Sequence, residues 1–148
     1  LTEVYLAKAL LGFAFSLFMG TAVLLLNNAL GNQPWLLLLF MTLGTIMAVE
    51  LGLIFASFIN NVNTLFATAR LAQLIILVPA LFYMFPWLPQ WIAKIFPSYY
   101  FIQPLMDISQ AGATWADVSA SVLILIGCDV IIGITAWQMV KRIRQFAV

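Results

Sequence analysis

The chain has 148 residues, of which 65% are apolar and only 7% are charged, and its formal net charge is +1. A soluble domain is about 45–50% apolar and about 25% charged, so this composition indicates an integral membrane protein. The net charge excludes a nucleic-acid-binding surface, which would require a basic patch. Because a spanning helix needs about 20 residues, the chain has room for four or five spans and for no separate soluble domain.

Apolar runs separated by turn-forming residues predict four membrane spans, and the predicted fold is an all-α polytopic membrane helix bundle. The first span covers about residues 5–27 and the second about 35–57. A polar connection with three asparagines leads to a third span at about 71–85, and the last covers about 118–139. A signal peptide is the alternative for the first run, which is however too long and lacks a basic leader.

Five of the six prolines fall between Pro79 and Pro104, in a stretch that is also rich in aromatic residues. Proline inside a helix removes a hydrogen bond and clashes with the preceding turn, so this stretch cannot be one regular helix. Such chain is tolerated in a membrane where protein shelters it, and Trp and Tyr favour headgroup depth. The sequence therefore predicts an outer re-entrant hairpin at residues 86–104, before the last span. Its defining residues are Pro79, Pro86, Pro89 and Pro97, with Trp87, Trp91, Tyr99 and Tyr100 as headgroup anchors.

The basic residues predict the orientation of the spans. With four spans, both termini and the connection at residues 58–70 lie on one side, which carries five of the six basic residues. The sixth, Lys94, lies on the other side. The positive-inside rule makes the side with five basic residues cytoplasmic.

Two spans carry small residues at four-residue spacing, a pattern that lets helix backbones approach closely. Ordinary packing within the bundle is a better interpretation of these stripes than a dedicated dimer face. The stripes are Gly12, Ser16 and Gly20 in the first span, and Gly44, Ala48 and Gly52 in the second.

Two carboxylates, Glu50 and Asp129, lie at membrane depth. A charge that faces lipid there costs about 3 kcal/mol, so each should face protein or water, or be protonated. Two roles for these carboxylates are open: they line a cation or proton path, or they form a structural hydrogen bond or ion pair. For Glu50 we favour an ion pair with Arg70 at the start of the next span. Near Asp129, Gly127 and Gly133 thin the helix, so a neighbouring helix or water can approach its carboxyl.

The sequence gives no sign of catalytic chemistry, and no enzyme activity or cofactor is expected in this chain. There is no histidine and the acids are scattered, which argues against a metal site and excludes Ser-His and Cys-His pairs. The phosphate-binding pattern Gly-x-x-x-x-Gly-Lys-Ser/Thr is absent. The single cysteine, Cys128, cannot form an intrachain disulfide.

The first span opens with Glu3-Val-Tyr-Leu-Ala-Lys8, and the Pro-rich stretch reads Phe85-Pro86-Trp-Leu-Pro89-Gln-Trp91 and then Pro97-Ser-Tyr-Tyr-Phe. This order of features, over nearly the whole chain, resembles the C-terminal portion of type 2 ABC transporter permeases, the ABC-2 exporter-type membrane subunits. In that family six spans form half of a dimeric channel, and the segment between the fifth and sixth spans re-enters from outside. The chain departs from the family at Phe82 and Tyr83, where Ser-Gly is common, and at Asp107, near a common Arg.

The resemblance implies a permease subunit of an ATP-driven transporter for export or efflux, in a bacterial cytoplasmic membrane with both termini in the cytoplasm. It also implies a path shared with a second copy or a paralogous permease, and a separate ATPase subunit that holds ATP and Mg²⁺. The chain is then expected to be a fragment of a longer six-span permease, with two spans upstream of Leu1. Two alternatives are a stand-alone ion-coupled carrier or channel that uses Glu50 and Asp129, and a non-transporting membrane scaffold.

Overall fold

The computed structural model describes residues 2–59 and 62–146. These residues are mostly helical and contain no strand. Four of the helices contain a stretch of 19 to 25 residues that is long and apolar enough to cross a membrane, which confirms the predicted all-α bundle with four spans. The four are α1 (Thr2–Leu26), α2 (Pro34–Ala56), α3 (Val62–Met84) and α6 (Trp115–Phe146).

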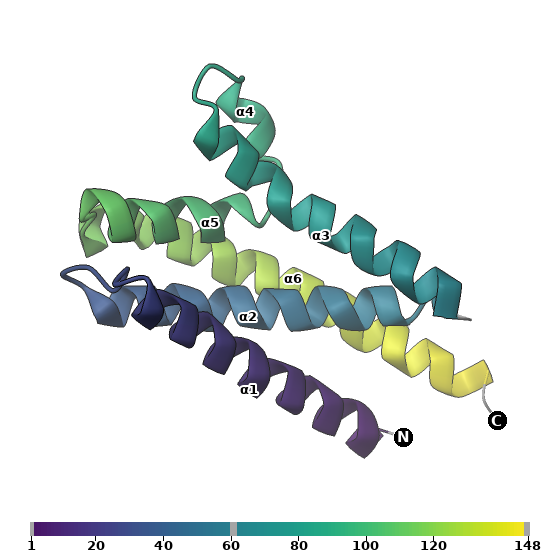
Figure 1. Cartoon of the computed structure of the whole chain (residues 1–148). Coiled ribbons are helices and arrows are strands. Elements are labelled where there is room, and N and C mark those ends of the chain that lie inside the picture. The colour runs from purple at the N-terminus through teal and green to yellow at the C-terminus, as the bar shows by residue number, and fades with distance from the viewer. Residues whose placement is uncertain (1, 60–61, 147–148) are drawn as a thin grey trace.

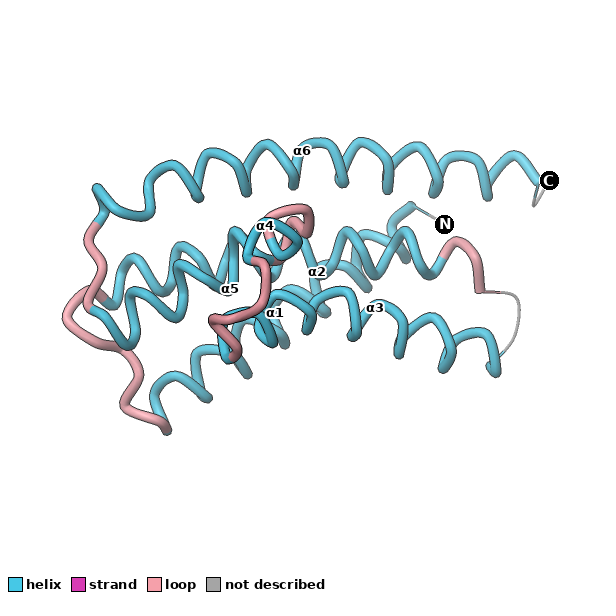
Figure 2. Tube along the Cα trace, turned by 90° about the horizontal axis from the view of Figure 1, so that it is seen from above, coloured by secondary structure: helices cyan, strands magenta, loops and turns pink. Residues whose placement is uncertain are grey.

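Helices α2 and α6 lie side by side, and α1 packs on the other side of α2, which is the central helix (Figures 1 and 2). Both chain ends lie at one end of the bundle, which we call the terminal end. The opposite end, which holds the turns at residues 27–33 and 112–114, is the turn end. The apolar core lies between α2 and α6 toward the turn end, and consists of Leu36, Leu37, Phe40, Met47, Ile108, Val118, Val122 and Leu125.

Helix α3 begins at Val62, nine residues before the predicted start of the third span at residue 71. The asparagines before Arg70 indicated a longer connection, but the stretch from 62 to 70 contains no Gly or Pro that would stop a helix. The 15 residues of the predicted span would also reach only about 23 Å, short of the roughly 30 Å hydrocarbon core. The longer helix removes that mismatch.

Helix α6 begins at Trp115, earlier than the predicted residue 118, because Thr114 and Asp117 cap its first turn. The backbone N–H and the hydroxyl of Thr114 both donate to Asp117 Oδ2, each over 2.8 Å. Gly112 lies just before this cap with a φ of +67°, a left-handed conformation that glycine adopts without steric cost. The last span therefore begins three residues earlier than predicted.

The Pro-rich stretch leaves the bundle after α3 and returns as α5. It forms the short helix α4 (Gln90–Ala93) and then α5 (Tyr99–Met106), which runs into a π-helical turn, η1 (Asp107–Ala111). The eight residues of α5 and five of η1 span about 20 Å, too short to cross a membrane. They lie against the turn-end half of α2 and α6 (Figure 1). The broken segment predicted at 86–104 is present, but it continues to residue 111 because no helix-breaking residue occurs between Pro104 and Gly112.

Two prolines free backbone carbonyls in the third helix and the turn after it, and side chains of the broken segment bond to both. Pro79 has no N–H for the carbonyl of Ile75 four residues earlier, and Pro86 has none for Phe82. The hydroxyl of Ser98 donates to Ile75 O over 3.3 Å. The amide of Gln90 donates to Phe82 O over 3.0 Å. The broken segment is thus bonded to α3 through the carbonyls that Pro79 and Pro86 leave free; Pro79, predicted as part of the broken segment, lies inside α3.

The aromatic residues of the broken segment divide into two groups. Trp87 and Trp91 are exposed, as headgroup anchors must be. Tyr99 and Tyr100 are half-buried and meet edge to face with ring centroids 5.3 Å apart. Tyr100 also packs against the core, so the burial of this pair fits packing within the bundle better than the predicted anchoring.

We expect Ser98→Ala to destabilise the protein. Ser98 is 2% exposed, and its loss removes the donor to the part-buried Ile75 carbonyl, at a cost of about 1 kcal/mol. Thermal unfolding of the purified protein in detergent should show a lower Tm for Ser98→Ala. Ser16→Ala, at an exposed position on α1, is the control and should leave Tm unchanged. Equal Tm values for the two variants would contradict the role given to Ser98.

Candidate functional site

The two intramembrane carboxylates are brought together by the pairing of α2 with α6. Glu50 and Asp129 lie about 24 Å and about 21 Å along these helices from their first residues, Pro34 and Trp115, which are at the same end of the bundle. The two carboxylates are thus at nearly the same depth on neighbouring helices. Both side chains line the same groove between the two helices.

Gly133 gives the Glu50 carboxyl the room that it occupies between the helices. A Cβ atom at position 133 would lie 2.6 Å from Glu50 Oε1 and 3.2 Å from its Cδ. Gly133 follows Asp129 by about one turn of α6, so the bare backbone lies next to both acids. Gly127, the other glycine expected to thin the helix here, is exposed and would meet no atom within 4 Å. Of the two glycines, only Gly133 therefore lets a group of the neighbouring helix approach α6 beside Asp129.

Neither acid is neutralised by the neighbouring helices. Glu50 Oε2 and both carboxyl oxygens of Asp129 are buried and have no hydrogen-bond partner within residues 2–59 and 62–146. Asp129 as a whole is only 6% exposed. Arg70, the predicted partner of Glu50, is exposed on α3, and the described residues show no hydrogen bond from it to Glu50 Oε2. The predicted ion pair is thus not formed at that oxygen.

The acids lie in a groove of about 320 Å³ between α2 and α6. Apart from the two carboxyl groups its walls are aliphatic or bare backbone. Its lining residues are Leu43, Ile46 and Glu50 from α2, and Ile126, Asp129, Val130, Gly133 and Ile134 from α6. In the described part of the chain no three His, Cys, Asp or Glu side chains come together, so the groove is not a metal centre of the usual kind. It combines an acidic anchor with an apolar surface.

The small residues of α1 and α2 do not form two matching stripes. Gly20 lies against Met41 of α2, and a Cβ at Gly12 would be 4.0 Å from Val49 Cγ2, so both face α2. Between them, Ser16 is exposed. Close packing in α1 is therefore found at Gly20, whereas Gly12 faces α2 across a hollow.

On α2 the stripe is divided between two faces. Gly44 lies against the ring of Phe101 on α5, whereas Gly52 would meet no atom within 4 Å and Ala48 is exposed. Residues four apart on a helix drift by about 40° per step, so Gly44 and Gly52 point about 80° apart. Gly44 therefore lets α5 approach, and Gly52 faces open space.

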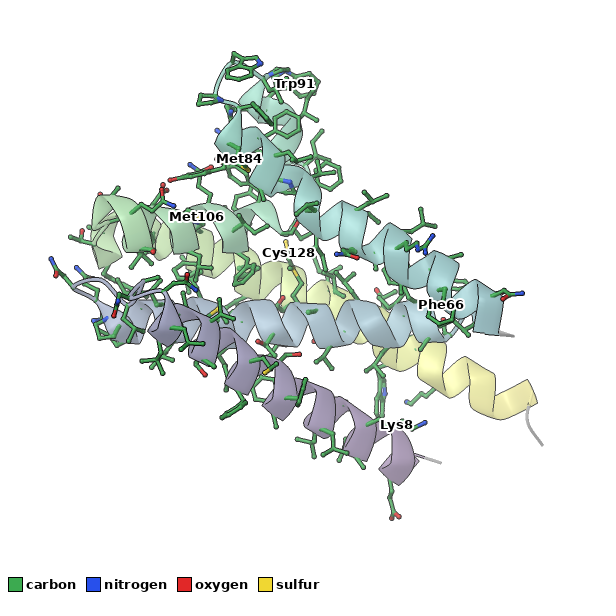
Figure 3. The ribbon with its side chains drawn as sticks, in the orientation of Figure 1. Lys8, Phe66, Met84, Trp91, Met106 and Cys128 are labelled. Atoms are coloured by element: carbon green, nitrogen blue, oxygen red, sulfur yellow. The ribbon has the colours of Figure 1, made fainter. Side chains whose placement is uncertain are left out.

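Two further hollows lie outside this acidic groove. One, of about 460 Å³, lies between α1 and α2 and is lined by Lys8, Gly12, Gly52 and neighbouring apolar residues; Figure 3 labels Lys8 near the terminal end. The other, of about 380 Å³, lies at the corner of α3 and the broken segment and is lined by Phe82, Tyr83, Pro86, Gln90 and Gln103. Burial raises the pKa of the Asp107 carboxyl, and its hydrogen bond with Gln103 opposes that change.

The different surroundings of the two α2 glycines predict opposite effects of the same substitution. In Gly44→Ala the new methyl group overlaps the Phe101 ring, and overpacking of this kind costs about 1–3 kcal/mol. In Gly52→Ala the methyl group enters open space, and alanine favours the helix. Thermal unfolding should give a lower Tm for Gly44→Ala and an equal or higher Tm for Gly52→Ala. The reverse order would show that α5 does not pack on α2 at Gly44.

No protein-family model, no curated protein and no solved structure matches this chain. Its function is therefore argued from its residues and their arrangement.

Proposed function

We propose that this chain is a membrane-spanning permease subunit of an ATP-driven ABC transporter of the ABC-2 type, and that it exports its substrate across a bacterial cytoplasmic membrane. The observation that carries the proposal is the broken segment between α3 and α6. It leaves the bundle through α4 and returns as α5, which reaches only part of the way along α2 and α6. A re-entrant segment before the last span is the feature that the resemblance to ABC-2 permeases implies.

The unburied faces of α1 and α3 support a path that is shared with a second permease copy or a paralogue. The apolar stretch of α1 has no buried residue, and that of α3 is almost as open. Long side chains such as Leu11, Phe15 and Phe18 are about two-thirds exposed. Lipid or neighbouring helices must cover these faces in a membrane. One copy is thus well suited to assembly within a larger transporter, with ATP and Mg²⁺ bound by a separate ATPase subunit.

The distribution of basic residues supports a cytoplasmic location for the terminal end. Lys8 and Lys141 lie on the terminal turns of α1 and α6, and the Lys141 ammonium lies 5.3 Å from the centre of the Trp137 ring. Such a Lys–Trp pair suits a membrane interface. At the turn end, Trp35 and Trp115 begin α2 and α6 with ring centroids 5.8 Å apart. These aromatic residues fit a membrane interface at each end of the bundle. The basic residues favour the terminal end as the cytoplasmic one.

The orientation predicts which engineered cysteines can be labelled from outside the cell. In a Cys128→Ala background, Lys94→Cys should react with a membrane-impermeant thiol reagent on intact cells, because Lys94 is exposed on the broken segment. Lys141→Cys, exposed beyond the end of the α6 span at the terminal end, is the matched control and should react only after the membrane is opened. Labelling of Lys94→Cys from the cytoplasmic side alone would overturn both the orientation and the ABC-2 assignment.

A second candidate function is a stand-alone ion-coupled carrier or channel. The observation that favours it is the pair of intramembrane carboxylates, Glu50 and Asp129. Glu50 Oε2 and both Asp129 oxygens are buried and lack donors in the described residues. Carboxylates within membrane spans commonly line ion or proton pathways. This candidate needs no ATPase, and that difference separates it from the first.

One reconstitution distinguishes the two functions. We expect the full-length protein to copurify with an ATPase encoded beside it, and to change the ATP hydrolysis rate of that partner in liposomes. Failure to associate with any such ATPase contradicts the permease proposal. Cation flux without ATP that disappears in Asp129→Asn, but persists in the exposed control Glu3→Gln, would instead establish the carrier.

A further inference from the structure

The groove between α2 and α6 contains buried acceptors but no donors. Glu50 Oε2, Asp129 Oδ1 and Asp129 Oδ2 have no hydrogen-bond partner in the described residues, and Asp129 is 6% exposed and lines the groove. A carboxylate in apolar surroundings is costly unless it is paired and hydrogen-bonded. The described residues therefore supply these oxygens with neither a positive charge nor an N–H or O–H donor.

The charged groups on the surrounding elements lie elsewhere. Lys8 on α1 lines the separate hollow near the terminal end, and Arg70 on α3 is exposed. On α6 the Lys141 ammonium lies over the Trp137 ring. Asp107, which follows α5, is another acid. Of the described side chains, none supplies the missing cation.

The walls of the groove limit what the missing cation can be. A Ca²⁺ ion takes six to eight oxygen ligands and Mg²⁺ takes six, whereas the lining offers two carboxyl groups among aliphatic side chains. A volume of about 320 Å³ is at the small end of ligand pockets, which are about 300–1,000 Å³. The lining thus suits an organic cation with an apolar body better than a metal ion.

We propose that this groove binds a small primary ammonium compound with an apolar body. An ammonium group brings the positive charge and the N–H donors that the Glu50 and Asp129 carboxyl groups lack among the described residues. The body of the ligand lies against Leu43, Ile46 and Ile134. Gly133 keeps the space in which the Glu50 carboxyl meets the ligand. Residues of this one chain form the whole site, so the proposal does not depend on whether the protein works with an ATPase.

The test measures binding of radiolabelled 2-phenylethylammonium to the full-length protein in nanodiscs, with empty nanodiscs as the blank for lipid partitioning. We expect saturable binding of one ligand per chain. Asp129→Asn and Glu50→Gln each remove a charged acceptor and should weaken binding about ten- to a hundredfold. Gly133→Ala displaces the Glu50 carboxyl and should also weaken binding. Glu3→Gln removes an exposed carboxylate on α1 and should leave binding unchanged.

Competing compounds test the chemistry of the ligand. The trimethylated analogue has the charge but no N–H donor, and 2-phenylethanol has a donor but no charge, so both should compete poorly. Equal competition by the trimethylated analogue, or displacement of the probe by Mg²⁺, would overturn the assignment to a primary ammonium. Absence of saturable binding to protein with an unchanged Tm would overturn the site itself. The binding assay contains no ATPase. A negative result therefore overturns the ammonium site but does not bear on the permease proposal, which the copurification experiment tests.

Discussion

The arrangement of this protein depends on one requirement, that backbone carbonyls freed by proline at membrane depth find donors within the protein. Pro79 and Pro86 free the carbonyls of Ile75 and Phe82, and the side chains of Ser98 and Gln90 bond to them. Residues that come later in the chain are thereby fastened to α3, so the broken segment folds back instead of extending into solvent or lipid. Its return path, α5, can then pack on α2 and α6.

The packing of α5 in turn decides which part of the α2–α6 pair remains open. Phe101 on α5 lies against Gly44, where the missing side chain permits close approach. Leu43, Ile46 and Glu50 lie on another side of α2, about 100–160° around the helix from Gly44. That side has no covering helix from α5, and it forms the groove with Asp129. The acids thus lie beside the bundle core rather than inside it.

Much of the fold could be predicted from the sequence, because the signals for it are local. Apolar length predicts the spans, and clustered prolines predict the break before α6. The sequence predicts too late a start for α3 because asparagines favour a loop, although a helix tolerates them where no Gly or Pro follows. The meeting of Glu50 with Asp129 was not predicted, since it depends on which faces of α2 and α6 pack together. The supposed Glu50–Arg70 pair was wrong at Oε2 for the same reason: nearness in sequence does not determine which way a helix face points.

Along its length the α2–α6 pair changes from closely packed core to an open groove. Toward the turn end, Leu36 and Phe40 of α2 and Val118 and Val122 of α6 are buried in the core, and α5 covers them. About two turns farther on, the same two helices bear unpartnered acids and an open aliphatic groove. Apolar residues of similar volume would fill that position at no cost in stability, because buried charges rarely stabilise a fold better than hydrophobic packing does. The needs of the fold therefore do not account for two acids at this depth, and the ammonium site proposed above would account for them.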